Sequence, residues 1–406
     1  MHAPTYGLIL SGGGARAAYQ VGVIAEIMDI LRRAGVPRTG LLQVICGTSA
    51  GAINAAALAC GADDPDAAVQ DLLDVWSGFS VEQVYESDIL SMLGSGARWL
   101  SLFSLGWLLS QKRLRPRYLL NNDPLGRLLQ ARIDLSRLPQ LLAQGHLQAL
   151  GISAFSYGRG EHVTFFESAR PMQPWVRNQR LAQASRLSHA HLLASAAIPF
   201  IFPAIALEGT SGAAASFYGD GSMRQTAPIS PAIHLGADRI LVIGAGRMNE
   251  PQAQRPDTAD YPSLAQIAGH ALSSIFLDAM AVDVERLRRI NQTLNLIAPE
   301  HRAKTHLRPV ELLLIAPSQR LDAMAAAHAH EVPATVRGLM RTLGARAGDS
   351  SGQAGALLSY LLFEAPYTQA LIALGRRDAQ AQHAEIVKFF QPSATETDAP
   401  EPALAG

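Results

Sequence analysis

A serine between small residues is the position in this sequence best suited to nucleophilic chemistry. Gly47-Thr48-Ser49-Ala50-Gly51 fits the pattern G-x-S-x-G and lies between an apolar run and an alanine-rich stretch. In this pattern the serine occupies a sharp strand-to-helix turn, and the residues two positions away must be small. The positive end of the following helix favours an alkoxide and then a tetrahedral anion at Ser49.

Three consecutive glycines near the start could hold an anion. Gly12, Gly13 and Gly14 separate an apolar run from a helical pattern, so their backbone N–H groups can converge on a phosphate or an oxyanion. Gly12, Gly14 and Ala17 also fit the dinucleotide pattern G-x-G-x-x-G/A, which requires an acid at the end of the next strand. The next expected strand, 41–46, ends without an acid, and no P-loop lysine follows the glycines.

The serine needs a base, and an aspartate is a better candidate than any histidine. Asp220 follows a short strand and lies beside Gly221, which allows close backbone approach. A buried carboxylate with a raised pKa can accept a serine proton, although Asp-Gly alone is more often a turn. Two H-x-H pairs lack Asp, Glu or Cys at metal spacing, so no metal site is predicted and we interpret these histidines as surface or structural residues: His189, His191, His328 and His330.

The elements around these residues predict an α/β fold. Apolar runs at 6–10 and 41–46 each precede a helical pattern, which implies a parallel sheet covered by helices. Asp64-Pro65 predicts the start of another helix. Further strands are expected at 147–155, 162–167, 216–219, 239–245 and 310–315.

Composition divides the chain and limits its function. A polar, proline-rich stretch separates residues 6–245 from a helix-rich C-terminal region, 263–390, and the tail 391–406 is expected to be disordered. Charged residues make up 17%, well below about 25%, which excludes a largely disordered chain. Lys plus Arg and Asp plus Glu are 34 each, so the basic footprint of a nucleic-acid-binding protein is missing. Two cysteines fit a reducing compartment.

Membrane association is predicted to be peripheral at most. The N-terminus lacks the pattern of a signal peptide, and no apolar run reaches the roughly 18 to 20 residues of a transmembrane helix. We therefore expect a cytoplasmic protein. The segment 99–117 places an apolar strip before four basic residues, which favours either contact with an anionic lipid surface or a buried helix with a solvated end.

Four segments in order over residues 6–245 resemble the patatin-like phospholipases. They are LILSGGGARAAYQVGV, GTSAGAINAAAL, ASAAIPFIFPAI at 194–205 and YGDGSMRQTAPISPAIHLGADRILVI at 218–243. The resemblance implies a three-layer α/β/α fold with a mostly parallel central sheet. It also implies a lipid acyl hydrolase that cleaves phospholipids or other fatty-acyl esters through a Ser–Asp dyad, without a metal or an organic cofactor.

The resemblance assigns roles residue by residue. Ser49 looks like the nucleophile and Asp220 like the base. The three glycines look like the oxyanion loop, with Arg16 as its basic companion, and the motif glycines are Gly47, Gly51 and Gly221. The sequence departs from the family at two positions. The family commonly has glycine where this chain has Ala17, and glycine or alanine where it has Ser222. Both residues are small, so we expect the backbone to be kept.

Three other functions stay open from the sequence. The first is a non-catalytic lipid-binding protein on the same fold, which the intact serine, aspartate and glycines disfavour. The second is a nucleotide-binding oxidoreductase, which the missing acid disfavours. The third keeps the dyad but acts on a short-chain ester or a thioester.

Overall fold

The structure is a computed structural model, and it describes most of the chain. The described residues are 3–86, 118–177, 179–208, 215–247, 264–305, 307–334, 336–338 and 353–391. Two predictions lie outside these residues, one on the apolar and basic segment 99–117 and the other on the tail beyond Gln391.

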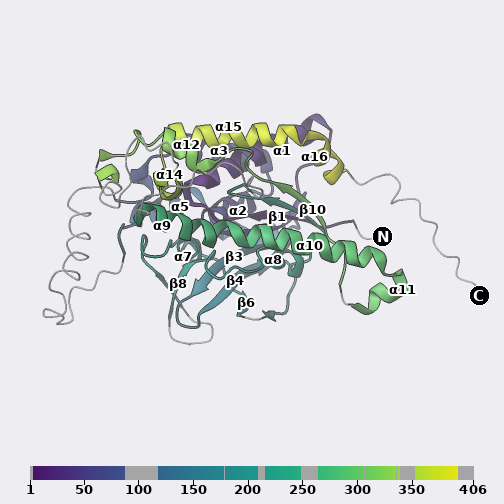
Figure 1. The fold of residues 1–406 in the computed structure, drawn as a ribbon. Helices are drawn as coiled ribbons and strands as arrows, with labels where there is room; N and C mark the ends of the chain where they lie inside the picture. Colours follow the sequence, from purple (N-terminus) through teal and green to yellow (C-terminus); the bar gives the residue numbers. More distant parts are fainter. Residues whose placement is uncertain are drawn as a thin grey trace, which may run out of the picture.

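A single mixed sheet forms the centre of the fold (Figure 1). Its path runs β10-β9-β1-β2-β3-β4-β6-β5, and β8 pairs with both β3 and β7. The strands from β10 to β3 are parallel to their neighbours, whereas β3 and β4 form an antiparallel hairpin. The strands are β1 (Tyr6–Leu10), β2 (Leu42–Thr48), β3 (Ala149–Ser156), β4 (Glu161–Ser168), β5 (Val176–Arg177), β6 (Arg180–Ala184), β7 (Ile205–Leu207), β8 (Ser216–Asp220), β9 (Arg239–Ile243) and β10 (Glu311–Ile315).

Helices cover both faces of the sheet. The larger layer contains α1 (Ala18–Arg33), α2 (Ala50–Cys60), α3 (Pro65–Ser77), α5 (Asp123–Arg132), α6 (Leu138–Ala143), α7 (His189–Ser195), α14 (Gln353–Leu361), α15 (Ala365–Ala381) and α16 (His383–Phe390). The opposite face packs against α8 (Ser230–His234) and α10 (Ala279–Leu296). The remaining described helices are α9 (Leu264–Ser273), α11 (Pro299–Arg302) and α12 (Leu321–Ala327).

The apolar strands are continuous because both faces are buried. In β1, Leu8 and Leu10 belong to the core beneath α1 and α2, whereas Ile9 belongs to the core beneath α8 and α10. Successive side chains of a strand point to opposite faces, so a strand covered on both sides has to be apolar at every position. The family expectation of a three-layer, mostly parallel fold is therefore confirmed.

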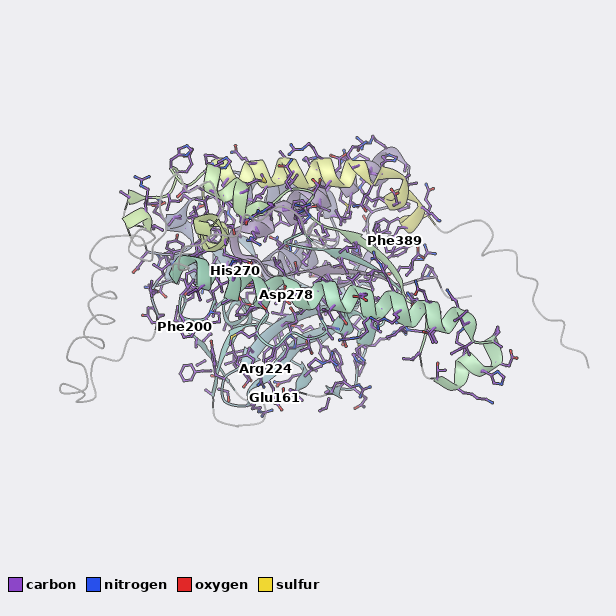
Figure 2. All side chains as sticks on the ribbon, viewed as in Figure 1. Glu161, Phe200, Arg224, His270, Asp278 and Phe389 are labelled. Atoms are coloured by element: carbon purple, nitrogen blue, oxygen red, sulfur yellow. The ribbon has the colours of Figure 1, made fainter. Side chains whose placement is uncertain are left out.

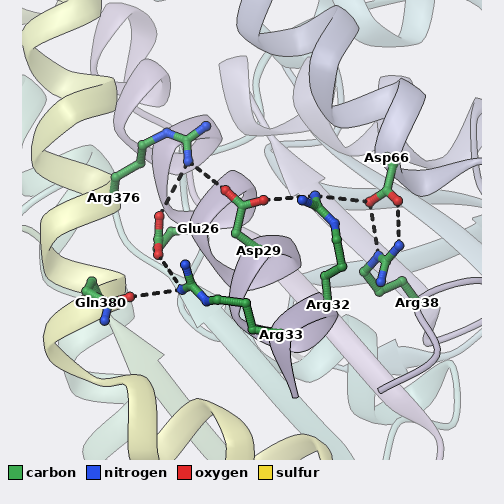
Figure 3. A network of polar contacts seen from close by, with 8 residues as sticks. All are labelled: Glu26, Asp29, Arg32, Arg33, Arg38, Asp66, Arg376 and Gln380. Atoms are coloured by element: carbon green, nitrogen blue, oxygen red, sulfur yellow. Dashed lines mark hydrogen bonds and ion pairs between the residues drawn. The ribbon is translucent and has the colours of Figure 1, made fainter. Parts of the chain in front are cut away.

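The C-terminal residues pack directly onto the first half of the chain. Helix α15 lies along α1 so closely that a Cβ on Gly22 would collide with the carbonyl oxygen of Ile372. Figure 3 shows the ion pairs at the edge of this contact, where Arg376 of α15 reaches Asp29 and Glu26 of α1 at 3.0 and 3.4 Å. Partly exposed pairs of this kind contribute about 1 kcal/mol or less, so the close helix packing holds the two segments together.

Most expected elements are present within a few residues of their predicted bounds. The strands predicted at 147–155, 162–167, 239–245 and 310–315 correspond to β3, β4, β9 and β10. The Asp64 side chain accepts a hydrogen bond from the Ala67 N–H and caps α3, as its N-cap pattern indicated. The short strands β5, β6 and β7 were not predicted, because β5 and β7 have only two and three residues and β6 (RLAQA) mixes polar with small apolar residues.

One helical stretch among the described residues, Ile267–Leu296, is long and apolar enough to cross a membrane. The pair α14–α15 meets the same criterion only if its 94° bend is taken as part of one span. Length and composition of this kind are weak grounds for a membrane span, because core helices meet them as well.

Candidate active site

Ser49 occupies a strained turn between β2 and α2. Its backbone has φ 56° and ψ −130°, and its side chain is buried. A Cβ on Gly51 would collide with the carbonyl oxygen of Leu10, and one on Gly47 would collide with the carbonyl oxygen of Gly51. The turn therefore requires glycine on both sides of the serine, which is the reason the motif has this spacing.

Strand pairing brings Asp220 to the end of β2. Strand β2 occupies one edge of β3 as far as Thr48, which pairs with Ser153. Strand β8 then takes over the same edge of β3, and its last residue, Asp220, pairs with Ala154. The residue after β2 and the residue that ends β8 consequently meet, although 171 positions separate them in the chain.

The side chains of Ser49 and Asp220 form a direct hydrogen bond. Ser49 Oγ donates to Asp220 Oδ2 at 2.7 Å, and the Ser222 N–H donates to Asp220 Oδ1 at 2.9 Å. Burial raises the pKa of Asp220 to about 6, because the lost hydration of the carboxylate outweighs the hydrogen bonds from Ser49 and Ser222. At neutral pH the carboxylate is ionised and positioned to accept the Ser49 proton.

Ser195, at the end of α7, connects the serine turn to the aspartate strand. Its Oγ accepts the Ser49 N–H at 2.8 Å and donates to the carbonyl oxygen of Ser153 at 2.6 Å. Its own carbonyl oxygen accepts the Gly221 N–H at 3.1 Å. One fully buried residue thus contacts the backbone on both sides of the Ser49–Asp220 pair.

The glycine loop leaves several backbone donors without a partner. Within the described part of the chain, the N–H groups of Gly12, Gly13 and Gly14 donate no hydrogen bond. Gly14 has φ 55°, and a Cβ there would collide with the carbonyl oxygen of Tyr360 on α14. Gly14 lines the same cavity as Ser49, so free donors lie in a position to face an oxyanion.

A buried polar network holds this loop against the helix that follows Ser49. The Gln20 side chain donates to the carbonyl oxygen of Ser11 at 2.7 Å, and the Asn54 amide donates to Gln20 at 3.2 Å. The Trp76 indole donates to Asn54 at 2.9 Å. Because Gln20 and Asn54 are fully buried and paired, they fix the distance between the loop and α2.

Arg16 follows the glycines but points away from Ser49. Its Nε and Nη2 donate to Ser359 Oγ on α14 at 2.9 and 2.7 Å, and its guanidinium lies 4.1 Å from the Tyr360 ring centre. It lines a second cavity of about 410 Å³, whose lining does not include Ser49 or Asp220. The Arg16 side chain therefore connects the glycine loop to the C-terminal region.

An apolar cavity of about 240 Å³ leads to Ser49. Its wall is formed by side chains of α2, α3, α5, the segment after α7 and Phe363, among them Leu72, Trp76, Phe79, Leu125, Leu129, Ile198 and Phe202. Two exposed polar residues, Asp71 and Arg132, also line it and mark an opening to solvent. The chemistry of this wall suits a hydrocarbon chain.

No described histidine contacts the Ser49–Asp220 pair. The ring of His162 lies against the backbone of Gly221, and burial lowers the pKa of His162 to about 4, so it is neutral at physiological pH. His189 bonds the carbonyl oxygen of Ile133, and the Nδ1 of His191 contacts Ser188. Among the described residues no group of three His, Cys, Asp or Glu side chains could hold a metal ion.

Sequence reasoning missed several residues that hold the site in place or line its cavity. Ser195 lies inside the segment ASAAIPFIFPAI, which carries part of the family resemblance but suggested no role for this serine. Ser359, Tyr360 and Phe363 belong to the region 263–390, in which no chemical motif was found. Their roles follow from contacts that the sequence gives no sign of.

The structure is a three-layer α/β fold in which a buried serine and a buried aspartate share a hydrogen bond beside an apolar cavity. The sequence model of the patatin-like phospholipase family matches residues 8–233, and the chain belongs to that family. Membership indicates a lipid acyl hydrolase in general terms. Among solved structures, VipD from Legionella pneumophila is similar over 91% of this chain and 67% of its own, with 14% identity and a TM-score of 0.34. No curated protein sequence matches the chain.

Proposed function

We propose that this protein hydrolyses fatty-acyl esters with Ser49 as nucleophile and Asp220 as general base. The observation that carries the proposal is the 2.7 Å hydrogen bond between their side chains beside an apolar cavity. A histidine is not needed, because a buried carboxylate with a pKa of about 6 is ionised at neutral pH and basic enough to accept a proton.

The reaction proceeds in two halves. Ser49 Oγ attacks the ester carbonyl carbon while its proton passes to Asp220 Oδ2, and the tetrahedral intermediate collapses as that proton moves to the departing alcohol or lysolipid. Water then attacks the acyl-enzyme, gives its proton to Asp220, and releases the fatty acid as Ser49 takes the proton back. Both halves return Asp220 to its ionised form, so the cycle balances without a further reactant.

The glycine loop would stabilise the negative charge of the intermediate. Among the described residues, the N–H groups of Gly13 and Gly14 have no hydrogen-bond partner, and Gly14 lines the same cavity as Ser49. The helix that begins at Ala50 adds its positive end. Removal of one donor from such a site costs about 3 to 4 kcal/mol of transition-state stabilisation. Arg16 acts here as a positioning residue, because it holds the loop to Ser359 rather than facing the substrate.

The cavity supports a long apolar acyl group as the substrate. Its wall is largely hydrocarbon, with Ser49 and Gly14 among its lining residues. A phospholipid or another fatty-acyl ester would place its chain in this cavity and its head group outside. A short-chain ester or thioester would leave most of the wall uncovered, so long-chain substrates should react faster.

Covalent labelling tests this function. Wild-type protein, Ser49→Ala and Asp220→Asn are exposed to a long-chain fluorophosphonate, and intact masses are recorded over time. We expect one adduct on wild type, none on Ser49→Ala and slow labelling of Asp220→Asn. Ser156→Ala, which changes another fully buried serine, should label like wild type.

Three results would count against the proposal. Labelling that survives Asp220→Asn but fails when a histidine is replaced would assign the base to that histidine. A wild type that takes no adduct, even with lipid vesicles, would favour the non-catalytic lipid-binding protein. Bound NAD in the purified protein would favour the oxidoreductase.

A further inference from the structure

Phe200 lies in a tight turn beside the Ser49 cavity, with its backbone and its ring both in unfavourable positions. Its φ is 67°, in the region that favours glycine, and its side chain is 75% exposed, more than any other aromatic side chain in the described ranges. The residues two positions before and after Phe200 are buried instead of exposed. Ile198 and Phe202 are buried and line the cavity.

Backbone hydrogen bonds fix this turn on both sides. The N–H groups of Ile201 and Phe202 donate to the carbonyl oxygen of Ile198 at 3.1 and 3.0 Å, and the carbonyl oxygen of Phe200 accepts the Leu119 N–H at 3.0 Å. A left-handed backbone is costly for a bulky residue and free for glycine. Neither the backbone nor the core therefore explains a phenylalanine at this position.

The turn lies at the end of the molecule that carries the site. The parallel strands direct their carboxyl ends to the edge where Ser49 follows β2. Phe389 marks the opposite end, because it packs against Tyr6, the first residue of β1. Figure 2 shows Phe200 and Phe389 on opposite sides of the protein. Because Ile198 and Phe202 line the Ser49 cavity, Phe200 projects on the same side as the serine.

We propose that Phe200 anchors the protein to a lipid surface by inserting its ring among the acyl chains, with the opening of the active site held close to that surface. The inference deepens the proposed function and rests on it, because a lipid acyl hydrolase takes its substrate from an aggregate or bilayer. Phe is one of the residues that membrane-surface segments bury at the boundary between head groups and acyl chains. Transfer of the exposed ring into hydrocarbon removes its unfavourable contact with water.

A matched aromatic on another face provides the control. Phe217 of β8 is 57% exposed, and its neighbour Tyr218 points into the core, where it packs against Phe165 on the α7 side. Alternation along a strand places Phe217 on the opposite face of the sheet. It offers a similar exposed ring with no positive φ, and no lipid contact is proposed for it.

Vesicle binding tests the anchor directly. The protein carries Ser49→Ala so that the lipid is not consumed, and it is mixed with vesicles of phosphatidylcholine, whose zwitterionic surface removes net charge as a cause of binding. Phe200→Gly and Phe200→Asn are expected to lower the partition coefficient by about tenfold or more, and Phe217→Ala by less than about twofold. Both Phe200 variants suit a positive φ, so their unfolding temperatures should not fall.

A polarity-sensitive thiol label reports where the ring goes. Cys46 and Cys60 are buried, and burial raises the pKa of each thiol to about 12, so a cysteine introduced at position 200 reacts selectively. The label on Phe200→Cys should shift to the blue only when vesicles are added. The same label on Phe217→Cys should not shift.

Three outcomes would overturn the inference. They are unchanged vesicle binding by both Phe200 variants, a label that is already blue-shifted in buffer because the chain covers it, and failure of the parent protein to bind vesicles.

A separate activity measurement distinguishes this inference from the proposed function. Activity is measured in protein that keeps Ser49. There, Phe200→Gly should reduce activity on vesicles by at least about fivefold more than it reduces activity on a water-soluble ester. If neither ester is cleaved but binding still depends on Phe200, the hydrolase proposal fails and the lipid anchor stands.

Discussion

The rate of Ser49 acylation should follow the ionisation of Asp220. Burial raises the pKa of this carboxyl group to about 6, and only its ionised form can accept the serine proton. The reactive fraction is about one-half at pH 6 and about one-tenth at pH 5, so the rate should fall nearly tenfold per pH unit below pH 5. Above about pH 7 the rate should be constant, since nearly all of Asp220 is then ionised.

The assay is the rate constant of fluorophosphonate labelling, measured by intact mass from about pH 4.5 to about pH 8. Asp220→Asn should reduce the plateau rate by about a hundredfold or more and remove the dependence on pH. The control is Asp283→Asn. Asp283 is another buried aspartate with a pKa raised by burial, but it accepts its hydrogen bonds from the Ile229 N–H and the Arg286 guanidinium, outside the site. Its replacement should leave the midpoint near pH 6.

Unfolding measurements provide an independent check on the same group. The folded-state pKa of Asp220 is raised from 3.8 to about 6, so the folded protein binds the proton more tightly than the unfolded chain. The free energy of unfolding should therefore fall as the pH rises from about 3 to about 7, by about 3 kcal/mol in total for a two-unit shift. The difference between wild type and Asp220→Asn in urea unfolding isolates this contribution.

A labelling rate that stays constant down to pH 5, or an Asp220→Asn protein that labels at the wild-type rate, would refute the assignment of Asp220 as base.

Two further substitutions test the surroundings of Ser49. Ser195→Ala should lower kcat about tenfold to a hundredfold with little change in KM, because the buried Ser49 N–H loses its acceptor; Ser185→Ala removes a hydroxyl that has no partner within the described residues and should change neither constant. Gly51→Ala should lower the free energy of unfolding, measured by chemical denaturation, by about 3 kcal/mol or more, because the new Cβ would collide with backbone. Gly158→Ala is the control: the space around its new Cβ is open, so the free energy of unfolding should change by less than about 0.5 kcal/mol. Equal effects within either pair would contradict the contacts around Ser49.

Local sequence patterns were sufficient to predict the first two strands and the turn at Ser49. The apolar runs that became β1 and β2 are buried on both faces, so every position carries the signal. The steric demand on Gly47 is equally local, because a Cβ there would collide with Gly51 of the same turn, whereas a Cβ on Gly51 would collide with Leu10 of the adjacent β1. Where the constraint lies within a few residues of the chain, the sequence displays it.

The pairing of Ser49 with Asp220 could be proposed from the family resemblance, whereas periodicity alone gives no indication of it. It depends on β8 taking over the edge of β3 at the point where β2 ends, and β8 has only five residues. Nothing in a five-residue strand specifies which edge it joins. Ser195 was missed for the same reason, because its partners Ser49 and Ser153 lie 146 and 42 positions away.

The glycine loop shows why the C-terminal region has to be considered with the site. Gly14 lies against the backbone of Tyr360, and Arg16 bonds to Ser359, so α14 forms one wall of the loop that would face the oxyanion. The Arg16 guanidinium is buried and bonds to a neutral hydroxyl, and a buried charge of this kind keeps its position only while its partners stay in place. Displacement of α14 would release the loop donors from their fixed geometry and leave the Ser49–Asp220 bond intact. Oxyanion stabilisation depends on preorganised donors, so Ser359 and Tyr360 of α14 should influence kcat through the glycine loop, without touching the substrate.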